Sequence, residues 1–97
     1  MIVKTHKAEG KLILAICDNL LLGKKIEDEN LQLDLSSSFY DGDEKSEKEI
    51  LQLMKAANSI NAVGEKTIDF LLKNKIIQKE NIIRIKKIPH AQVVFFS

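Results

Sequence analysis

An uninterrupted run of six apolar residues, Leu12 to Cys17, limits the fold more than any other feature of this sequence. A strand with one face in water alternates apolar and polar residues, so a strand without that alternation must be covered on both faces. The run is also far shorter than the ~20 residues of a membrane-spanning helix. With residues 2–7 before it and a Glu9-Gly10 turn between, it predicts a β-hairpin whose second strand is central in a sheet.

Downstream patterns predict a third strand and a first helix. Leucines alternate with polar residues over 31–35, as in a half-buried strand. In the loop that follows, Phe39 and Tyr40 are expected to anchor the chain against the core. Ser46 and Glu49 have the spacing of a capping box, in which each side chain bonds the other residue's backbone N–H. A helix is therefore expected to begin at Ser46.

A second helix is expected from about residue 63 to residue 73. Residues 58–61 are expected to break or bend the first helix. Gly64 then lies inside the second helix, where glycine costs about 1 kcal/mol relative to alanine, so a close helix–helix approach is expected there. Asn74 is expected to end this helix as a left-handed cap.

Two further strands complete the pattern. Residues 82–86 predict a strand with Ile83 and Ile85 on one face, residues 89–90 predict a turn, and residues 92–96 predict a final apolar strand. The order is β-β-β-α-α-β-β within a single domain that spans the whole chain. Strands on both sides of a helical pair predict an α+β fold, with a mostly antiparallel sheet packed against the two helices.

The net charge of +1 hides a strong separation of charge along the chain. Residues 1–26 hold five lysines and two acids, a net charge of +3, and residues 73–97 hold six basic residues and one acid, a net charge of +5. Residues 27–49 hold nine acids and two lysines, a net charge of −7. If the two ends of the chain meet in space, one face of the domain is basic.

Five basic residues are the candidates for a phosphate-binding face, because lysine and arginine side chains position nucleic-acid backbones. They are Lys24, Lys25, Arg84, Lys86 and Lys87. Polar residues at predicted turns and helix ends are the candidates for the centre of this face, since such positions carry functional side chains more often than core positions do. They are Asn61 (or Asn58), Glu65, His90 and Gln92. This prediction requires Gly23, Gly64 and His90 to converge on one face.

The sequence contains no recognised catalytic or metal motif. Cys17, His6 and His90 are widely spaced and form no CxxC or HxxxH pair, so no metal site and no cofactor are expected. The Gly23-Lys24 pair lacks the first glycine of a phosphate loop. Cys17 ends an apolar strand and is expected to be a buried small hydrophobe rather than a nucleophile. His90 is the best single candidate for proton transfer.

Several short motifs, taken together, resemble one family. They are Cys17-Asp18, Leu21-Leu22-Gly23-Lys24, Phe39-Tyr40, Asn61-Ala62-Val63-Gly64-Glu65 and Ile88-Pro89-His90-Ala91-Gln92. Over nearly the whole chain this pattern is similar to the archaeal domain of unknown function 424 family, whose members tend to have a glycine near the position of Asn74. The resemblance implies an archaeal, cytoplasmic protein in the company of translation genes. It implies no activity, because the family is named for lacking one.

Three functions fit these features. The first is a non-enzymatic binding module that contacts RNA or the ribosome through the basic face. The second is a protein-interaction module or homodimer, in which the acidic middle meets basic ends or residues 93–96 pair edge to edge. The third is a small enzyme centred on His90 or Cys17. No membrane contact and no DNA-binding motif are expected, and the high lysine and glutamate content is typical of a thermophile.

Overall fold

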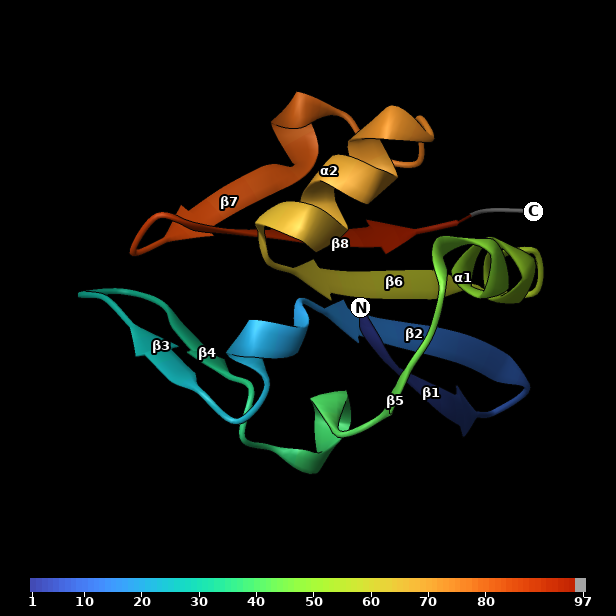
Figure 1. Cartoon of the computed structure of the whole chain (residues 1–97), viewed down its shortest axis with the longest axis horizontal. Coiled ribbons are helices and arrows are strands. Elements are labelled where there is room, and N and C mark those ends of the chain that lie inside the picture. The colour runs from blue at the N-terminus through green and yellow to red at the C-terminus, as the bar shows by residue number, and fades with distance from the viewer. Residues whose placement is uncertain (96–97) are drawn as a thin grey trace.

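The fold is a six-stranded sheet with two helices on one face and a small hairpin on the other (Figure 1). The computed structural model describes residues 1–95. The main-sheet strands are β1 (Ile2–Ala8), β2 (Lys11–Cys17), β5 (Asp43–Glu44), β6 (Ser59–Val63), β7 (Ile82–Ile85) and β8 (Ile88–Val94). The small hairpin is β3 (Lys25–Glu27) with β4 (Gln32–Asp34), and the helices are α1 (Glu47–Met54) and α2 (Glu65–Lys73). Short 3-10 turns are η1 (Asn19–Leu21), η2 (Ser38–Tyr40) and η3 (Lys79–Asn81).

The main sheet has the strand order β5-β1-β2-β6-β8-β7. β2 and β6 run parallel, with Leu14 opposite Ile60, and all other neighbouring pairs are antiparallel. The sequence-based prediction of an α+β fold with a mostly antiparallel sheet is therefore confirmed. β2 lies inside the sheet and is covered on both faces, as its unbroken apolar run requires.

The larger core lies between one face of the main sheet and the two helices. Leu14 and Ile16 of β2 are fully buried there, together with Ile60 of β6, Ile50 of α1 and Leu71 of α2. Alternate residues of a strand point to the same face, which is why these two β2 residues share this core. We call this side the helix face.

Helix α1 begins as the sequence predicted. Ser46 Oγ accepts a hydrogen bond from the Glu49 backbone N–H at 3.2 Å, and Glu49 Oε1 accepts one from the Ser46 backbone N–H at 3.0 Å. These bonds to Ser46 lower the pKa of the Glu49 carboxyl. The capping box is therefore complete.

The opposite face of the sheet is covered only in part, by the β3–β4 hairpin and the η2 segment. Cys17 of β2 packs there with Leu33 of β4 and with Tyr40 of η2, both of which are buried. The Phe39 ring stacks on His6 with ring centroids 4.5 Å apart, and His6 Nε2 donates to the Phe39 carbonyl at 2.9 Å. The predicted anchoring of this loop by two aromatic residues is confirmed.

Residues 58–61 were expected only to break or bend a helix, but α1 already ends at Met54 and Ser59–Val63 forms strand β6. Ile60 and Ala62 are fully buried on the helix face, and the strand pairs with β2 on one side and β8 on the other. These distant partners stabilise a segment whose own sequence suggests only an interruption. Helix α2 accordingly begins at Glu65, after the strand.

Two details of the later turns also differ from expectation. Asn74 has φ −92° and is not left-handed; its side-chain amide donates to the Phe70 carbonyl at 2.9 Å, and Lys75 takes the left-handed conformation with φ 59°. The turn expected at residues 89–90 lies instead at Lys86 and Lys87, between the paired residues Ile85 and Ile88. Pro89 is tolerated in β8 because it lies just beyond the last residue pair between β6 and β8. The expected end of the last strand at Phe96 lies outside the described residues.

Candidate nucleic-acid interface

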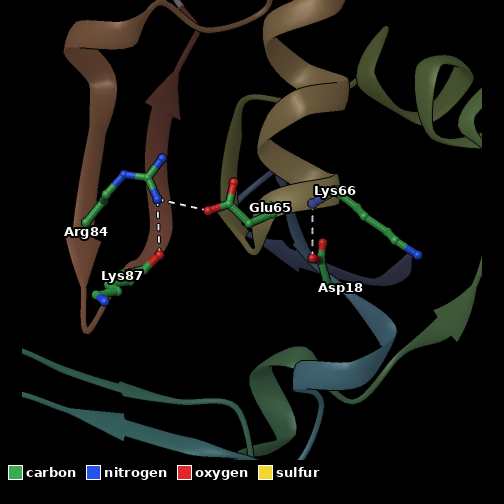
Figure 2. Close-up of polar contacts among 5 residues, drawn as sticks. All are labelled: Asp18, Glu65, Lys66, Arg84 and Lys87. Atoms are coloured by element: carbon green, nitrogen blue, oxygen red, sulfur yellow. Dashed lines mark hydrogen bonds and ion pairs between the residues drawn. The ribbon is translucent and has the colours of Figure 1, made fainter.

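The carboxyl ends of the parallel strands β2 and β6 lie at the same end of the sheet, and a partly buried polar contact joins the segments that follow them. Asp18 follows β2, and its carboxylate accepts hydrogen bonds from the backbone N–H groups of Lys66 and Thr67 at 3.0 and 2.8 Å. The Thr67 hydroxyl, which is fully buried, donates to the same carboxylate at 2.7 Å. Asp18 therefore caps α2 from a different element (Figure 2). It places no side-chain cap on η1, the short turn that directly follows it.

Gly64 is required at this junction because the Asp18 carboxylate fills the space beside it. Its φ is +113°, and a Cβ at this position would lie 2.3 Å from Asp18 Cγ. The close approach that the sequence suggested at Gly64 thus involves a carboxylate and not a second helix. Two of the family-like motifs, Cys17-Asp18 and Val63-Gly64, meet here for a structural reason.

An open groove of about 1240 Å³ runs beside this junction, between η1 and α2. The groove is lined by charged residues of both signs. They are Lys24, Lys45, Lys66, Lys73, Asp18, Glu44, Glu47, Glu65 and Asp69. Four lysines against five acids give the groove no basic character, and Lys73 is paired with Glu47 at 3.6 Å. A polyanion is therefore not expected to bind inside it.

Arg84 and Glu65, both candidate site residues, form an ion pair. Arg84 Nη1 lies 2.9 Å from Glu65 Oε1 and also donates to the Lys87 carbonyl at 3.1 Å (Figure 2). Both side chains are more than half exposed, so the pair adds at most about 1 kcal/mol to stability. It fixes the start of α2 to the β7–β8 hairpin on the helix-face side.

The two lysines at the tip of the β7–β8 hairpin, Lys86 and Lys87, have an uncommon backbone. Their φ angles are 49° and 70°, the φ signature of a type I′ turn, which strongly prefers Asn-Gly or Gly-Gly. Left-handed conformation costs an L-residue with a Cβ roughly 1–2 kcal/mol. Both residues are exposed, and neither has an ion-pair partner within the part of the chain that the structure describes. We call this pair the lysine turn.

Lys24 and Lys25 lie at the start of the β3–β4 hairpin. Lys24 lines the groove, and Lys25 is paired with Glu27 at 3.3 Å. The tip of this hairpin carries acidic residues at 27–29. The hairpin shares an apolar cluster with Ile85 and Ile88, which flank the lysine turn, and its tip points to the same side of the molecule as that turn in Figure 1. The five basic candidates therefore form no continuous patch: an acidic tip and the Arg84–Glu65 pair interrupt them.

The remaining polar candidates share the face opposite the helices. Asn61 of β6 lies directly across from Gln92 of β8, and His90 lies across from Val63 on one side and Ile83 on the other. Burial lowers the pKa of His90 below its ordinary value, and neither cross-strand neighbour carries a charge. Glu65, in contrast, lies at the start of α2 with Arg84.

Of the three segments that were expected to converge on one face, those of Gly64 and His90 are neighbours, and the segment of Gly23 reaches the same groove as Glu65. The Gly64 N–H donates to the carbonyl of Pro89 at 2.9 Å, and Pro89 directly precedes His90 in β8. Gly64 and His90 are therefore close in space. The Gly23 N–H donates to the Leu35 carbonyl at 2.8 Å, and Lys24 lines the same groove as Glu65. Their side chains diverge, however, because His90 points to the face opposite the helices.

Asn58, the alternative to Asn61, has a structural role. Its Oδ1 accepts from the Leu12 backbone N–H at 2.7 Å, and its own N–H donates to the Leu12 carbonyl at 2.8 Å. These bonds join the start of β2 to the chain just before β6. Asn58 is therefore committed to the fold.

Cys17 has the environment expected of a buried apolar residue. Its side chain is inaccessible to solvent, and burial, reinforced by the neighbouring Asp18 carboxylate, raises the pKa of its thiol to about 11. A thiolate at neutral pH is thereby disfavoured, so this site is unsuited to nucleophilic chemistry. Burial likewise raises the pKa of Tyr40 to about 12.

Two further features bear on the class of site. Within residues 1–95, no three histidine, cysteine or carboxylate side chains are grouped so that they could hold a metal ion. Over the same residues, neither helix is long and apolar enough to cross a membrane.

Comparison with known proteins places this architecture in a family. The crystal structure of an uncharacterized conserved protein from Methanopyrus kandleri is similar, with a TM-score of 0.79 and 24% sequence identity, covering 95% of this chain and 88% of that chain. This likeness shows a common fold. No curated protein matched the sequence. The model of the family described as Protein of unknown function (DUF424) matches residues 6–96, and the chain therefore belongs to the DUF424 family, as its motifs predicted.

Proposed function

We propose that the protein is a non-enzymatic module that binds RNA, free or within the ribosome, through the lysine turn. The observation that carries this proposal is the choice of residues at the turn. Two lysines occupy left-handed positions at which Asn-Gly would be more stable. Strained backbone positions cluster at functional sites, because a fold under selection for stability alone would remove them. The side chains of Lys86 and Lys87 are then the reason for the strain.

Phosphate is the ligand that this turn fits best. Two adjacent ammonium groups on an exposed hairpin tip can each approach a phosphate oxygen, and neither is neutralised by a carboxylate among the described residues. Arg84 lies on the same hairpin and uses only Nη1 for its two protein contacts. The Nε and Nη2 hydrogens of Arg84 therefore remain as donors for a third phosphate contact.

The decisive experiment uses a variant that strengthens the fold while it removes the site. Replacing the turn by Lys86→Asn/Lys87→Gly supplies the residues that a type I′ turn prefers and is expected to raise the free energy of unfolding by about 1–2 kcal/mol. Loss of RNA binding in this variant then has no explanation in loss of folding. Binding is measured by co-sedimentation with ribosomes and with free ribosomal RNA from the native host, across a salt series.

The expected result is weaker binding and a shallower salt dependence. Each phosphate contact to a single strand contributes about −0.7 to the slope of log K against log salt, so losing two contacts reduces its magnitude by about 1.4. The control is Lys48→Ala/Lys55→Ala, which removes the same charge from exposed positions at α1 and should leave binding unchanged. Equal loss of binding in both double variants would show that the net charge of the protein, and not the lysine turn, determines RNA binding. No binding by the unaltered chain at low salt would refute the proposal.

A second candidate, self-association, is favoured by the open edge of the main sheet. β7 is the last strand in the sheet order, so its outer edge has no partner strand among residues 1–95. Ile83 and Val94 beside this edge are each 54% exposed, and Phe95 is 36% exposed. Such an edge can pair with a second copy. Sedimentation equilibrium over a hundredfold concentration range tests this: a mass that remains 11.0 kDa throughout rules it out.

A further inference from the structure

Three polar side chains on the face opposite the helices are not used by the fold. Asn61, His90 and Gln92 make no side-chain hydrogen bond to any residue that the structure describes. Other amide side chains do have such partners: Asn58 binds the backbone of β2, and Asn74 binds the last turn of α2. No buried side-chain polar atom of the described residues lacks a partner, so the polar atoms of these three side chains are open to water and are candidates for binding something else.

The three side chains form one cluster because of the strand register. Asn61 and Gln92 are directly opposite, which places their Cβ atoms about 5 Å apart. His90 and Gln92 are two residues apart on β8 and point to the same face, about 7 Å apart along the strand. The result is an imidazole ring beside a pair of carboxamides, on strands that are held on both sides by sheet neighbours.

Apolar groups border this cluster along the sheet. Ile83 lies across from His90, and Val94 follows Gln92 two residues later on β8; each is 54% exposed. The chemistry of the surface is thus a flat ring, two amide groups able to donate and accept, and exposed aliphatic carbon around them. A planar heterocycle with mixed donors and acceptors complements this combination.

The nearby lysine turn indicates that this heterocycle is a base of a nucleic acid. His90 is the third residue after Lys87, which precedes β8, so the two lie at most about 10 Å apart along the chain at 3.4 Å per residue. A nucleic-acid strand whose phosphate contacts the lysine turn therefore brings a neighbouring base over this cluster. The acidic residues at 27–29 belong to the β3–β4 hairpin, which packs with Ile85 and Ile88 on either side of the lysine turn, and they repel phosphate from that side. The strand is therefore expected to pass over β7 and the cluster.

We infer that the face formed by β6, β8 and β7 binds a base of single-stranded RNA, stacked on His90 and hydrogen-bonded by Asn61 and Gln92. This inference rests on the proposed function, in which the lysine turn binds the phosphates. A base within a duplex is stacked and paired, so only an unpaired base can lie flat against the sheet. Carboxamides discriminate between bases through paired donor and acceptor contacts. The site therefore adds base preference to a charge-driven affinity.

Binding of the oligonucleotides rA8, rC8 and rU8 at fixed salt tests this directly. The unaltered chain is expected to bind one of the three at least about 5-fold more tightly than the weakest, the lower range of one bidentate base contact. The Asn61→Ala/Gln92→Ala variant should lose this preference and keep the salt slope. The matched control Gln32→Ala/Gln52→Ala removes two exposed amides elsewhere and should keep both. Equal affinities of the unaltered chain for all three oligonucleotides would overturn the base site.

His90 gives an independent check of stacking. Replacing it by alanine should weaken binding roughly 5- to 150-fold, the range for loss of one stacked base, whereas His90→Phe should keep the affinity. Equal weakening in both variants would contradict stacking.

Nuclear magnetic resonance of the unaltered chain needs no variant. The side-chain NH2 signals of Asn61 and Gln92 should shift on titration with the preferred oligonucleotide. If only the backbone signals of Lys86 and Lys87 shift, the base site is wrong and the phosphate site stands. If no oligonucleotide binds at low salt, both proposals fail.

Discussion

Replacing Asp18 by alanine should destabilise the protein more than any other single change to a half-exposed side chain. The Asp18 carboxylate lies between the end of β2 and the start of α2, where it accepts hydrogen bonds from two backbone N–H groups and from the Thr67 hydroxyl. Gly64, at the N-cap of α2, has no side chain that could replace it. The substitution therefore leaves the first turn of α2 without a cap.

The magnitude follows from two losses. Removing an N-cap side chain costs about 0.5–2 kcal/mol. The Thr67 hydroxyl, which is fully buried, loses its partner, and an orphaned buried donor costs about 1–3 kcal/mol. Water can reach part of the site because Asp18 itself is half-buried, so we expect a total of about 2–4 kcal/mol. For a domain of this size that lowers the melting temperature by about 10–25 °C.

Urea unfolding followed by circular dichroism measures this loss, with the slope m checked for constancy. The control is Asp69→Ala, which removes an exposed carboxylate from the same helix and should change stability by less than about 0.5 kcal/mol. Thr67→Val removes the hydroxyl that Asp18 satisfies, so Asp18→Ala should cost about 1–2 kcal/mol less in that background. An Asp18→Ala loss below about 0.5 kcal/mol, or full additivity with Thr67→Val, would refute the reasoning.

Three further outcomes are expected. Gly64→Ala should prevent stable folding or cost more than about 3 kcal/mol, because its Cβ would overlap the Asp18 carboxylate at a φ of +113°; an unchanged thermal melt would contradict this. Ser46→Ala should cost about 1 kcal/mol in urea unfolding through loss of the capping box with Glu49, and a neutral result would show that α1 needs no cap. Because burial lowers the pKa of His90 below 6.5, the unfolded chain takes up this proton first as pH falls. The free energy of unfolding should therefore decrease as pH falls below about 6.5, and His90→Gln should flatten this slope in urea titrations from pH 8 to 5; an unchanged slope would assign it to other groups.

The sequence predicted correctly those elements whose structure depends only on residues close together in the chain. The unbroken run at Leu12–Cys17 predicted an interior strand because no other arrangement hides both of its faces. The Ser46 and Glu49 spacing located the start of α1 because a capping box involves only its own turn. Phe39 and Tyr40 were predicted to anchor their loop because aromatic side chains of that size seldom remain in water.

Elements that depend on distant partners were not predictable in the same way. Ser59–Val63 has only five residues and borders a helix, and it is a strand because β2 and β8 lie on either side of it. Lys86 and Lys87 carry none of the residues that signal a type I′ turn, so proline drew the prediction to residues 89–90 instead. The Arg84–Glu65 pair joins residues 19 positions apart and needed the sheet order first.

Some polar residues of this protein stabilise the fold, and others do not. Asp18 and Asn58 are polar residues whose removal would leave backbone groups without partners, so stability accounts for them. Stability does not account for Lys86 and Lys87, which strain the turn, nor for Asn61, whose amide no described residue binds although strands disfavour asparagine. Local conflicts with the fold are expected where a sequence also serves binding. Lys86 and Lys87 lie on the β7–β8 hairpin and Asn61 lies on β6, its neighbour in the sheet, and this common location is the reason we propose one ligand for them. Glu9 and Lys75, whose φ angles of 53° and 59° are also left-handed, lie elsewhere in the fold.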